Sequence, residues 1–240
     1  GGVRQGAGVG LVPAAPDLRD VESEAMETID IVIHHDVLCG WSWIADLRLR
    51  ALAEELGGAL RIEYRPFPLR VEEMVPTARE IEAEAEALLS VAREPEALGI
   101  VPDLWRSADP PRTSLPPLLA MEAARIVGGV AARDRMLAAM RGAALVSGVN
   151  VARDDVLVEL AERCGLDVGR FVTALHNGGT RRLVLDPWEE ANERGIEATP
   201  AVLIGGEWLL TGARTIEEYR DTIERYAEKR CLYVPSRVVH

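Results

Sequence analysis

Cysteine is scarce in this 240-residue sequence, which has only Cys39, Cys164 and Cys231. An odd and sparse set does not form a disulfide framework and is typical of a reducing compartment. Long apolar runs are also lacking, since none approaches the ~20 residues that span a bilayer. Basic residues are outnumbered by acidic ones, 27 to 39, which gives a net charge of −12. This charge disfavours binding to nucleic acid because phosphate would be repelled. We therefore expect a cytoplasmic protein with no membrane and no nucleic-acid partner.

The two ends of the chain have little patterning. Residues 1–26 lack the basic start and continuous apolar run of a secretory signal. We expect them to be a disordered or extended N-terminal segment, and we expect 230–240 to be an irregular tail. Between these ends, a hydrophobic content of 48% and a charged content of 28% indicate an ordinary globular protein.

The most informative stretch surrounds Cys39. Three isoleucines alternate with other residues between Ile29 and Ile33, which predicts a strand. After Cys39, apolar residues recur every three or four positions until Gly57-Gly58, which predicts a helix and its end. Cys39 therefore lies near a helix N-terminus. The free N–H groups and the positive end of the helix dipole favour a thiolate there.

The remaining chain predicts two kinds of structure. A second strand over Leu60–Leu69 completes a βαβ unit, so the first two strands should be parallel. Residues 70–179 are rich in Ala, Glu, Leu and Arg and predict a set of helices, which include 72–92, 118–127 ended by Gly128-Gly129, and 131–146. Three further patterns predict a helix over 180–194, a hairpin over 201–210 and a closing helix over 215–229 with a capping box.

Three motifs resemble the DsbA family of the thioredoxin-fold superfamily, and the match runs over nearly all of 27–229. They are D-V-L-C-G-W-S-W from Asp36 to Trp43, R-P-F-P-L from Arg65 to Leu69, and Thr199-Pro200 followed by V-L-I-G-G. The resemblance implies an α/β thioredoxin-like fold made of 27–69 and 180–229, with a large all-helical insertion at 70–179. It also implies that Pro200 is a cis-proline beside the active cysteine.

The sequence departs from the dithiol members of this family, which carry Cys-x-x-Cys at the helix start. Here the motif reads Cys39-Gly40-Trp41-Ser42. A serine hydroxyl cannot form a disulfide, so the resemblance implies a monothiol oxidoreductase with Cys39 as the nucleophile. Ser42 could lower the pKa of the thiol through a hydrogen bond, or it could serve only as a helix-cap residue.

The resemblance also implies a substrate class. Glutathione is the expected co-substrate, with another small thiol or a peptide as alternatives, and we expect neither a tightly bound cofactor nor a metal. Gly40, Trp41, Thr199 and Pro200 are the expected binding residues, and the Thr199 backbone would pair with an extended ligand. His35 is a candidate pKa modulator because a nearby imidazolium favours the thiolate. The sequence leaves a homodimer open.

Two alternatives also remain open. Kappa-class glutathione transferases and 2-hydroxychromene-2-carboxylate isomerases are similar in Asp-Val-Leu-x-x-x-Ser-Trp, with a serine where this sequence has Cys39. In that case the site would activate the thiol of bound glutathione. The other alternative is a thioredoxin-fold adaptor without catalysis, since a lone cysteine is often only a small buried residue. We assign that structural role to Cys164 and Cys231.

Overall fold

The computed structural model describes residues 28–234, so the expected segment 1–26 and residues 235–240 of the expected tail lie outside the described residues. Its sheet has the strand order β2-β1-β3-β4. The strands are β1 (Ile29–His35), β2 (Leu60–Pro66), β3 (Ala201–Ile204) and β4 (Trp208–Thr211). β1 pairs parallel with β2 and antiparallel with β3, and β3 pairs antiparallel with β4. The parallel first pair and the hairpin confirm the pairing expected from the sequence.

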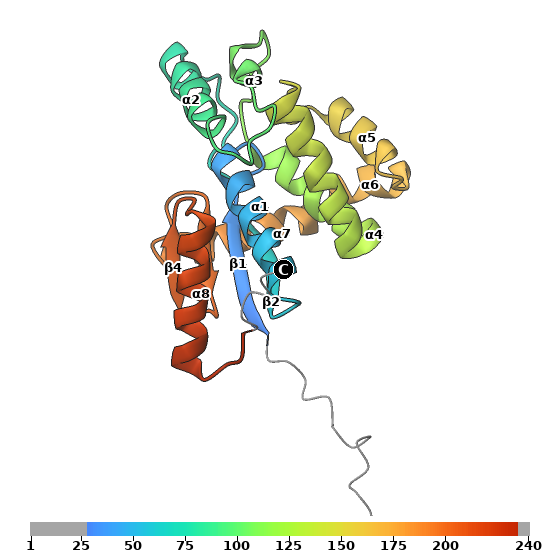
Figure 1. Ribbon diagram of the computed structural model, residues 1–240. Helices are drawn as coiled ribbons and strands as arrows, with labels where there is room; N and C mark the ends of the chain where they lie inside the picture. Colours follow the sequence, from blue (N-terminus) through green and yellow to red (C-terminus); the bar gives the residue numbers. More distant parts are fainter. Residues whose placement is uncertain (1–27, 235–240) are drawn as a thin grey trace, which may run out of the picture.

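Helices cover both faces of this sheet. They are α1 (Gly40–Glu55), α2 (Ala78–Val91), α3 (Asp103–Arg106), α4 (Leu115–Arg141), α5 (Asp154–Arg163), α6 (Val168–Leu175), α7 (Gly178–Glu193) and α8 (Ile216–Arg230). Helices α1 and α8 contact each other, and α7 lies against β2. Figure 1 shows α2 and α3 beyond the start of α1, and it shows α4, α5 and α6 together at one side. The element order is therefore β-α-β, a run of helices, then α-β-β-α.

Two helices differ from their predicted extents. The helix expected from position 72 begins only at Ala78, because Thr77 caps it in a capping box with Glu80. The helices expected over 118–127 and 131–146 are both present in α4, which begins earlier, at Leu115, and is followed by a π-helical turn at Gly142–Val146. Gly129 has a non-helical φ of 76°, so the first helix ends at the expected glycines and the second begins after a kink.

The core forms where the sequence pattern predicts it. The isoleucines Ile29, Ile31 and Ile33 of β1 are all buried beneath the flanking helices. Burial of each such side chain contributes about 1.5–3 kcal/mol relative to its exposure. This buried central strand ends at the turn that carries Cys39, so the turn is fixed by the core of the molecule.

One helical stretch, Leu115–Val146, is long and apolar enough to cross a membrane by length and composition. Half of its most apolar window is buried inside the molecule, with a mean hydropathy of 1.3. A core helix has the same properties, because its apolar side chains pack against neighbouring helices. The stretch contacts α5, α6 and α7, as expected for a packed helix.

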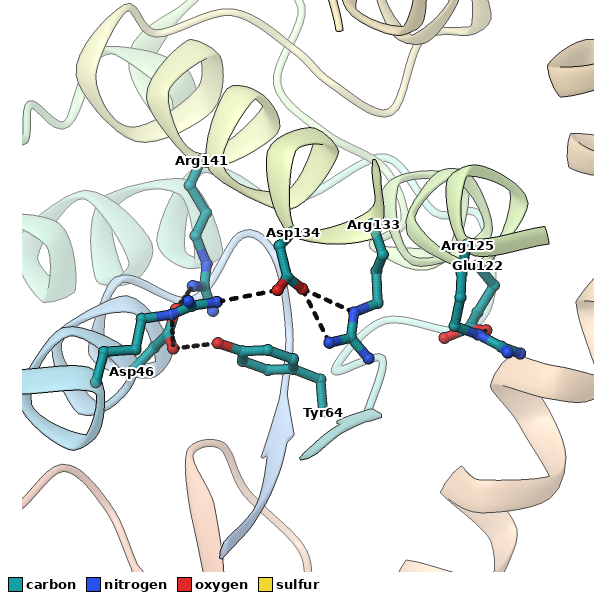
Figure 2. A network of polar contacts seen from close by, with 8 residues as sticks. Asp46, Tyr64, Glu122, Arg125, Arg133, Asp134 and Arg141 are labelled. Atoms are coloured by element: carbon teal, nitrogen blue, oxygen red, sulfur yellow. Dashed lines mark hydrogen bonds and ion pairs between the residues drawn. The ribbon is translucent and has the colours of Figure 1, made fainter. Parts of the chain in front are cut away.

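A polar network joins the run of helices to the central sheet (Figure 2). Asp46 of α1 accepts hydrogen bonds from the Tyr64 hydroxyl of β2 and from the guanidinium of Arg141 at the end of α4. The Asp46 and Arg141 side chains are only 6% and 1% exposed. A buried ion pair of this kind fixes relative position more than it adds stability, because both charges lose their water. The network therefore holds α4 in register with α1, the helix that begins at the Cys39 turn.

Candidate active site

Cys39 occupies the N-cap position of α1. Its backbone is extended, and its carbonyl accepts the N–H groups of Ser42 at 3.1 Å and Trp43 at 3.3 Å. Its own N–H donates to the Asp36 carbonyl at 3.3 Å, which closes the turn between β1 and α1. Cys39 is half-buried and its thiol is free. The structure thus places the cysteine at the helix start, as the sequence predicts.

Thr199 and Pro200 lie beside this cysteine. The Thr199–Pro200 peptide bond is cis. The Cys39 Sγ atom is 3.5 Å from the Thr199 carbonyl oxygen, although the two residues are 160 positions apart in sequence. The fold therefore brings together Cys39 and Thr199, two of the residues that the sequence assigns to one site.

The electrostatics of the thiol differ from the prediction. Burial raises the pKa of Cys39, and this effect outweighs the Ser42 and Thr199 hydroxyls and the Ser42 backbone N–H, which all lower it. The negative charge of Asp36 raises the pKa a little further. This direction is opposite to the one that the helix start alone predicts. The physical reason is that the thiolate loses its hydration at this depth.

Two hydroxyl groups beside the thiol make no hydrogen bond within residues 28–234 other than their contact with Cys39. They are Ser42 Oγ and Thr199 Oγ1, and both atoms are buried. Burying a hydroxyl group without a strong hydrogen bond costs free energy, so each of these O–H donors needs an acceptor. A thiolate at Cys39 is such an acceptor. The site is therefore poised to stabilise the thiolate once it forms, although the resting group is a thiol.

A pocket opens directly beside Cys39. It encloses about 440 Å³, counting the open space at its mouth, and lies between the start of α1, the β2–α2 loop, α2 and α3. Apolar side chains form most of its walls, namely Leu38, Leu69, Leu88, Val91 and Trp105. The polar lining residues include Asp36, Arg70 and Glu84. Arg70 stacks over the Trp105 ring at 4.6 Å and pairs with Glu84 at 2.9 Å.

Gly40 allows α2 to approach the active-site turn. A Cβ atom at position 40 would lie 3.0 Å from Leu88 Cδ2 and 3.1 Å from Val91 Cγ2. Such distances are tighter than ordinary packing contacts, so a side chain here would force the Leu88 and Val91 side chains to give way by a few tenths of an ångström. Glycine after the cysteine thus suits this close contact. Trp41, the next residue, is half-buried and lines the pocket.

His35 does not fill its predicted role. Its ring is fully buried, packs edge-on against Tyr64 at 5.4 Å, and does not line the pocket beside Cys39. Burial and the charges of Arg141 and Arg133 hold the pKa of His35 well below its usual range. The imidazole is therefore neutral near pH 7, and it does not supply the positive charge that was expected beside the thiol.

The other two cysteines lie elsewhere. Cys164 lines a separate pocket bordered by α4 and α5, and Cys231 is exposed after the end of α8. Both are free. Among residues 28–234, no group of three or more His, Cys, Asp or Glu side chains could hold a metal ion. Within this part of the chain, Cys39 is the cysteine that lines the pocket and contacts the Thr199 carbonyl, whereas Thr199 and Pro200 are not among the residues that line the pocket.

Sequence reasoning missed several residues of the site. Asp36 is 1% exposed, and its carboxylate accepts the Leu38 N–H at 2.9 Å and the Leu69 N–H at 2.8 Å. Burial raises its pKa to about 6 against the effect of these hydrogen bonds. Its place three residues before Cys39 was a usable signal. The apolar spacing of Leu88 and Val91 on α2 showed a buried face, but it did not show that this face covers the cysteine.

Comparison with known proteins decides the family. A model of the DSBA-like thioredoxin domain matches residues 30–224. The chain belongs to the DSBA-like thioredoxin domain family. The chain has the thioredoxin-like DSBA fold, with a mixed sheet of four strands and many helices.

This DSBA-like protein resembles characterised proteins to different degrees. It is 27% identical over 195 residues to the ClpXP adapter protein SpxH of Halalkalibacterium halodurans, covering 80% of this chain and 63% of that relative. It thus spans less than two thirds of the relative's length.

Solved structures share its fold. A putative protein disulfide isomerase from Nitrosomonas europaea has a TM-score of 0.74 at 17% identity and covers 85% of this chain and 99% of its own. The cytosolic disulfide reductase DsbM of Pseudomonas aeruginosa, solved with GSH, has a TM-score of 0.61 at 23% identity. That match covers 84% of this chain and 98% of DsbM.

Proposed function

We propose that this DSBA-like protein is a monothiol oxidoreductase that exchanges disulfides with glutathione. The observation that carries the proposal is the position of Cys39 at the start of α1, with Thr199 beside it and Ser42 in place of a second cysteine. A thiol at the mouth of a pocket can be reached by a small disulfide. The absence of a second cysteine from the motif limits the reaction to intermolecular exchange.

The proposed reaction has two steps. In the first, the Cys39 thiolate attacks one sulfur of glutathione disulfide. The Cys39–glutathione S–S bond forms, the original S–S bond breaks, and glutathione leaves as a thiolate that takes up a proton. In the second step, the thiolate of another thiol attacks the glutathione sulfur of this mixed disulfide and releases Cys39. A protein carrying a glutathione mixed disulfide can replace glutathione disulfide in the first step.

The raised pKa of Cys39 fits this scheme if the thiolate forms only as substrate binds. Ser42 Oγ and Thr199 Oγ1 are buried donors that, among residues 28–234, have only the Cys39 sulfur as an acceptor. Each can donate a hydrogen bond to a thiolate, and hydrogen bonds to a charged acceptor are stronger than neutral ones. The Thr199 backbone would hold the extended part of glutathione as an added strand. Trp41 and Gly40 would line its path.

The choice of glutathione and of a cytoplasmic location is supported by a relative. DsbM is a cytosolic disulfide reductase whose structure was solved with GSH. The sparse free cysteines of this chain suit a reducing compartment. We extend both properties to this protein as part of the proposal.

Mass spectrometry of the intact protein tests the proposal. The Cys164→Ser, Cys231→Ser variant leaves Cys39 as the sole thiol and is incubated with glutathione disulfide at pH 7.5. We expect one glutathione per chain, removed by added reduced glutathione. The matched control adds Cys39→Ser and should gain none. If Cys39 takes up no glutathione while the protein is folded, the proposal is wrong.

An adaptor function without catalysis is the second candidate. It is supported by the similarity to the SpxH adapter and by the raised pKa of Cys39, which disfavours a fast nucleophile. In that case Cys39 would be inert towards glutathione disulfide in the experiment above. Binding to a partner would then be unchanged by Cys39→Ala.

A further inference from the structure

Asp36 connects both sides of the pocket beside Cys39. One carboxylate oxygen accepts the N–H of Leu38, the residue before Cys39, at 2.9 Å. The other accepts the N–H of Leu69, in the loop after β2, at 2.8 Å. Leu38 and Leu69 both line the pocket. A single buried carboxylate therefore joins the cysteine turn to the opposite wall.

The same wall is fixed by a second set of hydrogen bonds. The Arg70 N–H donates to Ser114 Oγ at 3.1 Å, and the Ser114 N–H donates to the Arg70 carbonyl at 3.0 Å. The Ser114 hydroxyl also interacts with Asp36 and lowers the pKa of its carboxyl. Asp36 is thus the point where the cysteine turn, the β2–α2 loop and the start of α4 meet.

We propose that Asp36 is a positioning residue for the Cys39 site, whose carboxylate fixes the two walls of the apolar pocket and so sets the site's preference for reagents that carry an apolar group. This inference deepens the proposed function and rests on Cys39 being its reactive thiol. Asp36 does not touch the reacting atoms and acts through Leu38 and Leu69.

Protonation provides a way to test this role. A carboxylate oxygen that gains a proton becomes a donor and competes poorly for an N–H group. Burial raises the pKa of Asp36 to about 6, so this change falls in an accessible range. The charged groups that face the pocket with Asp36 are Arg70 and Glu84, paired at 2.9 Å, and the Glu84 charge raises the Asp36 pKa. Above pH 6 the Asp36 carboxylate is charged and its hydrogen bonds to Leu38 and Leu69 fix the two walls of the pocket. Below pH 6 the carboxyl is protonated, these hydrogen bonds weaken and the walls loosen.

The test compares two neutral reagents that differ only in apolar size, N-phenylmaleimide and N-methylmaleimide. Both alkylate the Cys39 thiolate, so the fraction of Cys39 that is thiolate affects both rate constants equally. It cancels in their ratio, which is the rate constant for N-phenylmaleimide divided by that for N-methylmaleimide. In the protein with Cys164→Ser and Cys231→Ser, we expect a ratio that is several-fold higher at pH 7.5 than at pH 5. The fall should be centred near pH 6.

Two variants assign the effect to Asp36. Asp36→Asn keeps the shape but presents an amide N–H to one backbone N–H, so its ratio should be low and independent of pH. Asp30→Asn, at the far end of β1 where Asp30 is partly exposed and pairs with Arg61, is the matched control and should behave as the parent. Ser114→Ala removes a group that lowers the pKa of Asp36, so the midpoint should move to higher pH.

The outcomes are decisive in either direction. The inference would be overturned if Asp36→Asn had the same ratio of rate constants as the parent at pH 7.5. It would also be overturned if the ratio in Asp36→Asn still fell between pH 7.5 and pH 5. Circular dichroism establishes that each variant is folded, and if Asp36→Asn does not fold, the Ser114→Ala midpoint decides alone. Because alkylation needs no disulfide exchange, failure of Cys39 to react with glutathione disulfide would refute the proposed function without changing this ratio.

Discussion

Leu88 Cδ2 of α2 lies 3.0 Å from the point where a Cβ atom at Gly40 would stand. The helix after the second strand, α2, is therefore packed onto the residue that follows Cys39. This contact explains why a glycine is found there, and it makes the position sensitive to the smallest substitution.

Gly40→Ala should destabilise the protein by about 1–3 kcal/mol, since the added methyl group crowds the Leu88 and Val91 side chains of α2. Adding Val91→Ala, which removes a second close neighbour of that Cβ, should recover part of the loss. Gly142→Ala is the matched control, because a Cβ there meets nothing within 4 Å. Urea unfolding measures all three. Equal stability of Gly40→Ala and the parent would show that α2 does not pack on this turn as described.

The Asp46–Arg141 pair should behave as a coupled unit. Arg141→Met leaves Asp46 without its buried cation, and we expect a loss of about 3–5 kcal/mol. Asp46→Leu leaves the Arg141 guanidinium uncompensated and should be similarly costly. The double variant should lose clearly less unfolding free energy than the sum of the two single variants, because neither buried member of the pair is left without the other. A double-mutant cycle from denaturant unfolding measures the coupling, and strict additivity would contradict the network in Figure 2.

Ser42→Ala tests the hydroxyl beside the thiol. The Ser42 hydroxyl lowers the pKa of Cys39, so its removal should raise that pKa further and reduce the thiolate fraction. We expect alkylation of Cys39 at pH 7.5 to slow about tenfold, equivalent to ~1.4 kcal/mol. The control, Ser90→Ala, removes a hydroxyl that bonds to the Glu86 carbonyl and should leave the rate unchanged. A serine that only caps the helix would give an unchanged rate in both variants.

His34 makes the protein less stable in mild acid. Burial, followed by the charges of Arg65 and Arg194, lowers the pKa of His34 from 6.5 to about 4. The unfolded chain therefore binds a proton near pH 6.5 that the folded protein binds only near pH 4. Stability from this group is present above pH 6.5 and is lost as the pH falls towards 4.

His34→Gln should remove this dependence. Between pH 7 and pH 5, the unfolding free energy of the variant should fall by about 2 kcal/mol less than that of the parent. Denaturant unfolding at the two pH values gives the difference. Asp36, whose pKa is raised, acts with the opposite sign in both proteins and cancels in the comparison. Parallel pH profiles would contradict a buried neutral His34.

The sequence predicts where the helices, strands and Cys39 lie better than it predicts what surrounds each side chain in the folded protein. The strand before Cys39, the helix after it and the Thr215 capping box follow from local patterns, and the structure has each of them. Local patterns also place the cysteine at the helix N-cap. The raised pKa of Cys39 depends on how α2 and the β2–α2 loop cover it, which is a tertiary property. The same coverage buries the Asp36 carboxylate, which accepts the Leu69 N–H, and the neighbouring His35 ring packs edge-on against Tyr64.

Turnover is the most direct test of the central claim that Cys39 performs monothiol exchange with glutathione. The measurement is the glutathione-dependent reduction of the mixed disulfide of glutathione and 2-mercaptoethanol, followed by NADPH consumption with added glutathione reductase. The account predicts a rate above the uncatalysed reaction that is lost in Cys39→Ser and retained in the protein with Cys164→Ser and Cys231→Ser. A rate that survives in folded Cys39→Ser, or no rate in the parent, would contradict it.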